Sequence, residues 1–160
     1  MEARELLAYA DWSRAVLKST VEANAETWDR EIETLSNFKS IRALTAHIAA
    51  AEERWVMRIL GKPRPDPGYE DRAGSSIDEV FKGWDSIRAA THAVVSKASD
   101  SDLSAVHHIS LPHWGLEFDR SVEQMLFQVF NHQTYHIGQI SMSLQRWGID
   151  PPNFDAIFAH

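Results

Sequence analysis

The stretch of sequence that decides the fold lies near the end of the chain and reads SVEQMLFQVFNHQTYHIGQISMSLQRWG, residues 121–148. Ser121 followed by Gln124 forms a capping box, which marks the start of a helix. Apolar side chains then recur at spacings of three and four residues, the period of one helical face. Gly148, with two prolines shortly after it, is typical of a helix end. The pattern predicts a long amphipathic helix that continues to Trp147.

Three earlier stretches carry the same helical period. The first helix is predicted over about residues 3–21. The second is predicted over residues 41–59, with Ser40 as its N-cap and Gly61 with the prolines behind it as its end. The third begins after the capping box formed by Ser76 and Glu79.

The connections between these helices differ in length and in pattern. Residues 61–75 contain three prolines and are predicted to form a loop. Residues 100–119 alternate apolar and polar side chains around a Pro-His-Trp-Gly turn at 112–115, which predicts a short β-hairpin or an extended connection. Four helices with such unequal connections predict an all-α four-helix bundle, residues 1–160 as a single domain, without a simple up-down-up-down topology.

Composition narrows the class of protein. The chain has 160 residues, of which 44% are hydrophobic, enough for one buried core. A net charge of -7 without a Lys/Arg cluster argues against nucleic acid as a partner. The absence of cysteine excludes disulfides, cysteine nucleophiles and thiolate metal ligands. Neither a signal peptide nor a membrane-spanning stretch of roughly 20 apolar residues is found. We therefore expect a soluble cytoplasmic protein with no membrane partner.

Two histidines interrupt the apolar face of the last predicted helix. His132 and His136 are four residues apart, so their Cβ atoms lie about 5–6 Å from each other on one side of a helix. Both occupy positions where the apolar period, from Val129 to Ile140, calls for a hydrophobic side chain. Burying an unsatisfied polar group costs about 1–3 kcal/mol, and a bound metal ion would compensate for that cost.

His47 occupies an equivalent position on the second predicted helix. It lies three residues after Leu44 and four before Ala51, both on the apolar face. Three neutral imidazoles suit zinc, nickel, iron or cobalt better than magnesium or calcium. Three protein ligands leave at least one coordination position open, as in catalytic sites. We therefore predict one divalent transition-metal ion held by three histidines, although each histidine alone is more often a hydrogen-bonded core or surface residue.

Several other side chains are candidates for roles around this site. Glu52 is placed for an orienting contact, but a solvated helix face is the favoured interpretation. Tyr135 and Gln139 flank the histidine pair and can hydrogen-bond a ligand. The histidines of the predicted hairpin either cover the site or, as we favour, lie on the surface: His107, His108 and His113. The first helix offers two aromatic side chains that either wall a pocket or pack ordinarily: Tyr9 and Trp12.

The sequence resembles the DinB family, the damage-inducible, YfiT-like group of metalloenzymes. The resemblance is carried by LTAHIAAAEERW at 44–55, NHQTYHIGQI at 131–140, LQRWGIDPPNFD at 144–155 and YADW at 9–12. It implies a four-helix bundle with a long crossover, a nickel or zinc ion on the three histidines, and a homodimer. Ile137 departs from the family pattern, since many members carry arginine after the final ligand histidine.

The family's activities include thiol-dependent S-transferases, which use bacillithiol or mycothiol-like cofactors, and a maleylpyruvate isomerase. The resemblance therefore favours a transferase that acts on a small-molecule substrate with a low-molecular-weight thiol. A metal-dependent hydrolase is a second hypothesis, with Glu52 or a hairpin histidine as base. A non-catalytic metal- or ligand-binding stress protein is a third.

Overall fold

The computed structural model describes residues 2–33 and 37–159, and this part of the chain is mostly helical. Its four long helices are α1 (Ala3–Ala23), α2 (Ile41–Ile59), α4 (Ile77–Lys97) and α6 (Val122–Arg146). Shorter helices are α3 (Tyr69–Arg72) and α5 (Asp100–Ser104), with 3-10 turns η1 (Ala25–Thr27), η2 (Pro112–Trp114) and η3 (Ala156–Phe158). The strands β1 (Val106–Leu111) and β2 (Leu116–Ser121) pair antiparallel.

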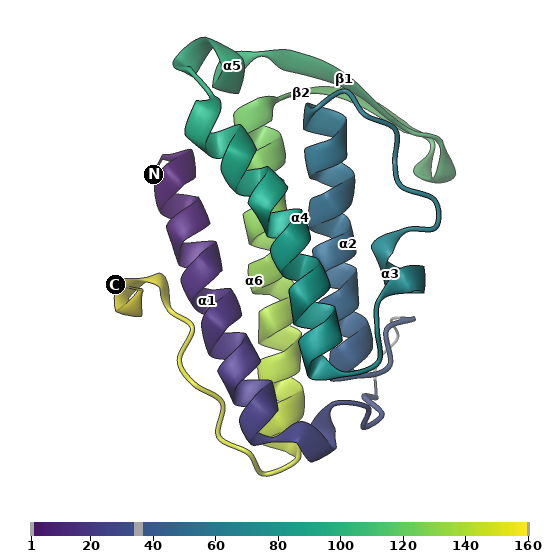
Figure 1. Ribbon diagram of the computed structural model, residues 1–160, viewed down its shortest axis with the longest axis vertical. Coiled ribbons are helices and arrows are strands. Elements are labelled where there is room, and N and C mark those ends of the chain that lie inside the picture. The colour runs from purple at the N-terminus through teal and green to yellow at the C-terminus, as the bar shows by residue number, and fades with distance from the viewer. Residues whose placement is uncertain (1, 34–36, 160) are drawn as a thin grey trace.

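The long helices lie side by side along one axis (Figure 1). Helix α2 contacts α4 and α6, and α1 contacts the same two helices from the other side. In Figure 1, α1 and α6 run downward while α2 and α4 run upward. The connection between α2 and α4 therefore returns along the length of the helices, which agrees with the expected departure from an up-down-up-down order.

The predicted helix starts are confirmed by side-chain caps. Ser40 Oγ accepts a hydrogen bond from the amide of Ala43. Ser76 and Glu79 form the reciprocal capping box, and Ser121 forms the same arrangement with Gln124. These bonds satisfy amides that the first turn of a helix leaves without intrahelical partners.

The prediction of a loop over residues 61–75 was wrong at its centre, where α3 forms. Tyr69 on α3 is buried, and its hydroxyl donates a 2.6 Å hydrogen bond to the carbonyl oxygen of Val80 on α4. Arg72 of α3 forms a salt bridge with Glu53 of α2. A four-residue helix is too short to show a period in sequence, and these long-range contacts stabilise it.

The predicted hairpin is confirmed. Val106 pairs with Ser121 and Leu111 with Leu116, and Gly115 closes the turn with φ 64°, a conformation that favours glycine. The hairpin joins α5 to α6 at the upper end of the helices (Figure 1). Only Ile109 of the hairpin is fully buried among the described residues, so most of its surface is exposed.

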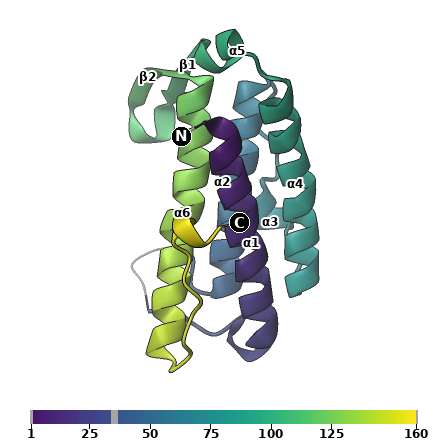
Figure 2. The same cartoon turned by 90° about the vertical axis from the view of Figure 1, so that its left-hand side faces the viewer.

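Side chains from all four long helices fill the core. One cluster includes Leu17, Leu44, Trp84 and Ile140, and a second contains mainly residues of α1 and α6. The segment after α6 runs back beside α1 (Figures 1 and 2), and Tyr9 donates a 2.9 Å hydrogen bond to the carbonyl of Phe154 there. None of the described helices combines the length and apolar character needed to cross a membrane.

A buried polar network crosses this core and corrects the sequence interpretation of Glu52. Its side chain is 1% exposed rather than solvated. Glu52 accepts hydrogen bonds from Trp84 Nε1 at 2.7 Å and from Arg88 Nη2 at 2.9 Å. Arg88 Nη2 also donates to Gln133 Oε1 at 2.7 Å, and Arg88 Nη1 lies 3.1 Å from Asp11 Oδ1. Glu52 is therefore part of the helix packing.

Candidate metal centre

Helix α2 positions His47 at the margin of the core. Leu44 and Ala51, one turn on either side, are 2% and 4% exposed and hold that face of α2 against its neighbours. The imidazole of His47 stacks on Phe38 with ring centroids 3.9 Å apart and an interplanar angle of 24°. The ring is therefore held between α2 and the segment that precedes it.

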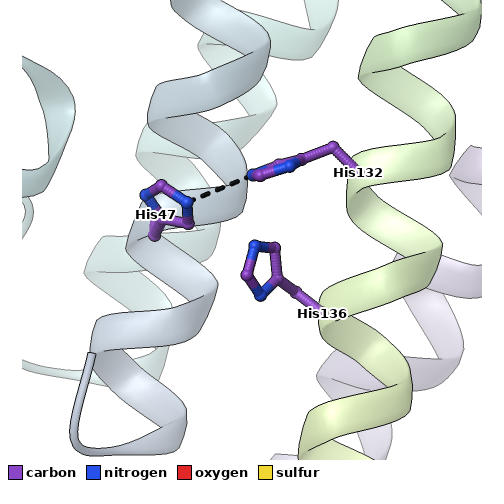
Figure 3. Close-up of side chains that lie close together, drawn as sticks. All are labelled: His47, His132 and His136. Atoms are coloured by element: carbon purple, nitrogen blue, oxygen red, sulfur yellow. Dashed lines mark hydrogen bonds between the residues drawn. The ribbon is translucent and has the colours of Figure 1, made fainter. Parts of the chain in front are cut away.

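Helix α6 positions His132 and His136 opposite His47 (Figure 3). Nε2 of His132 lies 3.2 Å from Nε2 of His47. The ring of His136 is centred 5.0 Å from that of His47 and 4.4 Å from that of His132. Each histidine offers a nitrogen within 4.8 Å of the others, so the predicted convergence of the three imidazoles is found.

The three histidines lie at the edge of the buried face rather than at its centre. His136 is buried, whereas His132 and His47 are partly exposed. The centre of the buried face of α6 is formed instead by Gln133, Ile137 and Ile140, each at most 2% exposed. The apolar stripe is thus rotated slightly from the predicted one, and this rotation leaves the histidine cluster accessible from one side.

Two side chains orient the imidazoles through their Nδ1 atoms. Glu70 Oε1 lies 2.8 Å from Nδ1 of His47, and Gln139 Oε1 lies 2.7 Å from Nδ1 of His136. A carboxylate and an amide oxygen only accept hydrogen bonds, so both Nδ1 atoms carry the proton. The Nε2 atoms of these two rings are therefore unprotonated, which is the form that binds metal ions.

The charge around Glu70 is balanced by Arg54. Arg54 Nη1 lies 2.8 Å from each carboxylate oxygen of Glu70. Burial acts to raise the pKa of Glu70, but the hydrogen bonds from His47 and Arg54 and the charge of Arg54 outweigh it and lower this pKa to about 2. Glu70 is therefore ionised at neutral pH.

Burial keeps two of the three imidazoles in the neutral form. It lowers the pKa of His132 to about 3, and the neighbouring charges of His136, His47 and Arg54 act in the same direction. Burial also lowers the pKa of His136, against the opposing effect of its hydrogen bond to Gln139. Neutral imidazole is the metal-binding form, so the environment favours ligation at neutral pH.

Two of the other candidates flank the site as expected. Gln139 contacts a ring of the cluster directly, as described above. Tyr135 is 61% exposed, and its ring packs edge-on against His136 with centroids 5.0 Å apart. Glu70, in contrast, was missed, because α3 has no periodicity and nothing in the local sequence places it beside His47.

The remaining candidates lie outside the cluster. His108 and His113 are exposed, as favoured, and His107 is partly buried on β1. Tyr9 lines a cavity of about 350 Å³, formed with Thr134, Ile137, Gly138, Ser141 and the segment 154–156. Trp12 packs against the Tyr9 ring, with centroids 6.0 Å apart.

A second cavity adjoins the histidine cluster through Gln139. It has a volume of about 220 Å³, and its walls combine apolar and charged side chains from α2, α6 and the segment before α2: Ile32, Glu33, Leu44, Gln139, Met142, Ser143 and Arg146. Since Gln139 hydrogen-bonds His136, the cavity and the imidazoles share a wall. A small molecule in this cavity would lie next to the imidazole cluster.

The donor set fits a divalent transition metal. Three nitrogen donors held close together match the preferences of zinc and nickel and offer no oxygen cage of the kind that calcium requires. The Nδ1–H groups of two rings donate hydrogen bonds to Glu70 and Gln139, which are the contacts that metal-ligating histidines usually make.

Two comparisons with known proteins bear on the family of the chain. A search among curated proteins gave no match. The model of the DinB family matches residues 1–160, the whole of the chain. With the family model covering the full sequence, the chain belongs to the DinB family.

Proposed function

We propose that this protein is a divalent-metal-dependent enzyme, a thiol-dependent S-transferase that acts on small electrophiles. The observation that carries the proposal is the convergence of His47, His132 and His136 within 4.8 Å at the accessible edge of the core. The four long helices form, in this proposal, a four-helix bundle of the DinB/YfiT-like type, with residues 60–76 as its crossover.

The three imidazoles would hold one nickel or zinc ion. Three protein ligands leave room for a further ligand, and an ion so bound supplies a Lewis acid that lowers the pKa of a thiol. Glu70 and Gln139 keep two rings in the tautomer that ligation needs. The protein contributes orientation and partial exclusion of water by placing the rings between α2 and α6.

The thiol must come from a small molecule. The sequence contains no cysteine, so no side chain of this chain can provide the sulfur nucleophile. The cavity beside Gln139 is the proposed place for the substrate, because it shares a wall with the imidazole cluster. Arg146 at this cavity would bind an anionic group, and Leu44 and Met142 would contact an apolar one.

The hydrolase hypothesis is less well supported, because it requires a general base beside the cluster. Glu52 hydrogen-bonds Trp84 and Arg88 in the core. Glu70 accepts hydrogen bonds from Arg54 and His47. Among the residues that the structure describes, neither of these carboxylates is free to accept a proton from a substrate.

The experiment that tests the proposal measures metal and thiol binding together. Purified protein is analysed for metal content, loaded with nickel or cobalt, and titrated with glutathione, bacillithiol and mycothiol. Binding of the sulfur to the ion should produce a charge-transfer absorption band. His132→Ala should abolish both metal loading and the band, whereas His113→Ala, which removes an exposed histidine outside the cluster, should leave both unchanged.

Other outcomes separate the alternatives. Turnover of ester or amide substrates by the metal-loaded protein without added thiol would favour the hydrolase. Metal binding with neither thiol binding nor turnover would favour a non-catalytic stress protein. Failure of the wild type to bind a divalent ion would refute the metal-dependent proposal altogether.

Family membership also supports two proposals on assembly and location. We infer a homodimer in the cytoplasm, and exposed apolar side chains on α6, Phe127 and Met142, provide surface that a second copy would cover. Light scattering coupled to size-exclusion chromatography decides the oligomeric state. A mass equal to one chain of 18.2 kDa would refute the dimer.

A further inference from the structure

The crossover between α2 and α4 contributes a carboxylate to the histidine cluster. Glu70 on α3 is 23 positions beyond His47 in sequence, and its Oε1 lies 2.8 Å from Nδ1 of that ring. This side chain is 22% exposed, so much of its hydration is replaced by contacts with protein groups. No other described carboxylate makes a hydrogen bond to one of the three clustered histidines.

We propose that Glu70 is a positioning residue of the metal centre, which fixes the tautomer and the ring orientation of His47 so that Nε2 faces His132 and His136. The inference rests on the metal site of the proposed function. It adds that one of the ligands is oriented by a residue of the crossover, outside the two helices that carry the histidines.

The chemical reason lies in the two nitrogens of imidazole. A neutral ring carries its proton on either Nδ1 or Nε2, and only the nitrogen without it can bind a metal ion. Ionised Glu70 accepts a hydrogen bond but cannot donate one, so it selects the tautomer protonated at Nδ1. The same bond stops the ring from turning about its χ2 angle, and Phe38 stacks on the face of the ring.

Glu70 is itself held in place, so it can act as a fixed point. Arg54 Nη1 lies 2.8 Å from both oxygens of the carboxylate. The flanking residues anchor α3 independently, Tyr69 by its hydrogen bond to Val80 and Arg72 by its salt bridge to Glu53. The loss of Glu70 alone therefore leaves α3 attached to both α2 and α4.

The contact of Glu53 with Arg72 supplies a matched control for the test. Both Glu53 and Glu70 are partly or fully buried carboxylates that link α2 and α3 to each other through an arginine. Only Glu70 contacts a histidine of the cluster. A change that merely loosens α3 should therefore have the same effect at either position, whereas a change in ligand orientation should appear at Glu70 alone.

The experiment compares wild type, Glu70→Ala, Glu70→Gln and Glu53→Gln by zinc affinity, measured by competition with a chromophoric chelator. Circular dichroism and a thermal melt of each metal-free protein report folding separately. We expect Glu70→Ala to weaken zinc binding about 10- to 100-fold, as the loss of such orienting contacts typically does. Glu70→Gln, which keeps an oxygen acceptor, should lose less, and Glu53→Gln should bind zinc within about 2-fold of wild type.

The cobalt-loaded proteins provide a second readout, because the visible absorption of Co²⁺ depends on the geometry of its ligands. We expect Glu70→Ala to change the position or intensity of this spectrum and Glu53→Gln to leave it unchanged. Equal zinc affinity and equal spectra in wild type and both Glu70 variants would overturn the positioning role while leaving the metal site intact. An equal loss of zinc affinity in Glu53→Gln and Glu70→Ala would also overturn it. Absence of zinc binding in wild type would overturn the proposed function and this inference with it.

Discussion

Replacing Arg88, which supplies the positive charge of the buried polar network, should strongly lower the free energy of unfolding. In Arg88→Met the side chain keeps much of its volume but loses three sets of polar contacts. Glu52, 1% exposed, would keep its bond from Trp84 but lose the opposite charge, and water cannot replace it. Gln133 is also 1% exposed, and its Oε1 would lose the hydrogen bond that Arg88 donates. Asp11 is about a third exposed and would be rehydrated.

The expected loss of unfolding free energy follows from the burial of these side chains. Removing one partner of a buried ion pair costs about 3–5 kcal/mol, because the remaining charge stays desolvated. For a chain of this length, each kcal/mol lowers the melting temperature by about 2–4 °C, so a decrease of roughly 6–20 °C is expected. Urea unfolding followed by far-ultraviolet circular dichroism measures the free energy directly.

Two further variants make the experiment decisive. Arg42→Met removes an ion pair with Asp29 whose side chains are 39% and 61% exposed, and it should cost at most about 1 kcal/mol. The double variant Arg88→Met with Glu52→Gln removes both charges and should recover part of the lost stability. A cost below about 1 kcal/mol for Arg88→Met, or a double variant as unstable as the sum of its two single changes, would refute the reasoning.

Four other predictions concern the metal centre and the contact between α3 and α4. His132→Ala should abolish metal loading by elemental analysis yet keep the helical circular dichroism, since many apolar contacts hold α6 without it. Burial lowers the pKa of His132 from 6.5 to about 3. Between these pH values the unfolded chain binds a proton at His132 and the folded chain does not. The urea midpoint of metal-free protein should therefore be highest above pH 6.5 and fall toward pH 3, less steeply in His132→Ala. Metal content should fall as the pH approaches 3, where His132 takes up a proton in the folded chain, and an unchanged content below pH 3 would contradict ligation by this histidine. Gly83→Ala should lower the melting temperature despite the better helix propensity of alanine, because the added methyl would lie 2.6 Å from Cε2 of the buried Tyr69 ring.

The sequence was sufficient for the helix starts because their signals are local. Ser76 with Glu79 and Ser121 with Gln124 satisfy amides within four residues of each other, so the pattern and the contact coincide. The hairpin turn was predictable for the same reason, since Gly115 supplies the left-handed residue between two alternating stretches. The convergence of the histidines followed from the phase of the apolar period on two helices.

Long-range contacts account for what the sequence could not supply. Helix α3 depends on Tyr69 reaching α4 and Arg72 reaching α2, and neither contact leaves a local pattern. Glu52 was misassigned to a solvated face because its partners, Trp84 and Arg88, lie on α4, more than 30 positions away. A correct prediction for Glu52 requires knowing that the buried Arg88 lies beside it. Glu70 was not predicted for the same reason, since its partner His47 is 23 positions away in sequence.

In the proposed metal site, the order of the three histidines along the chain has a consequence for biosynthesis. His47 precedes His132 by 85 positions, and His132 and His136 are both carried by α6, the last of the four long helices described. A nascent chain that ends before residue 132 therefore presents only one of the three clustered imidazoles, which by itself binds a divalent ion only weakly. In the proposed metal site, an ion held by all three histidines can therefore be captured only after α6 has been synthesised and has packed against α2.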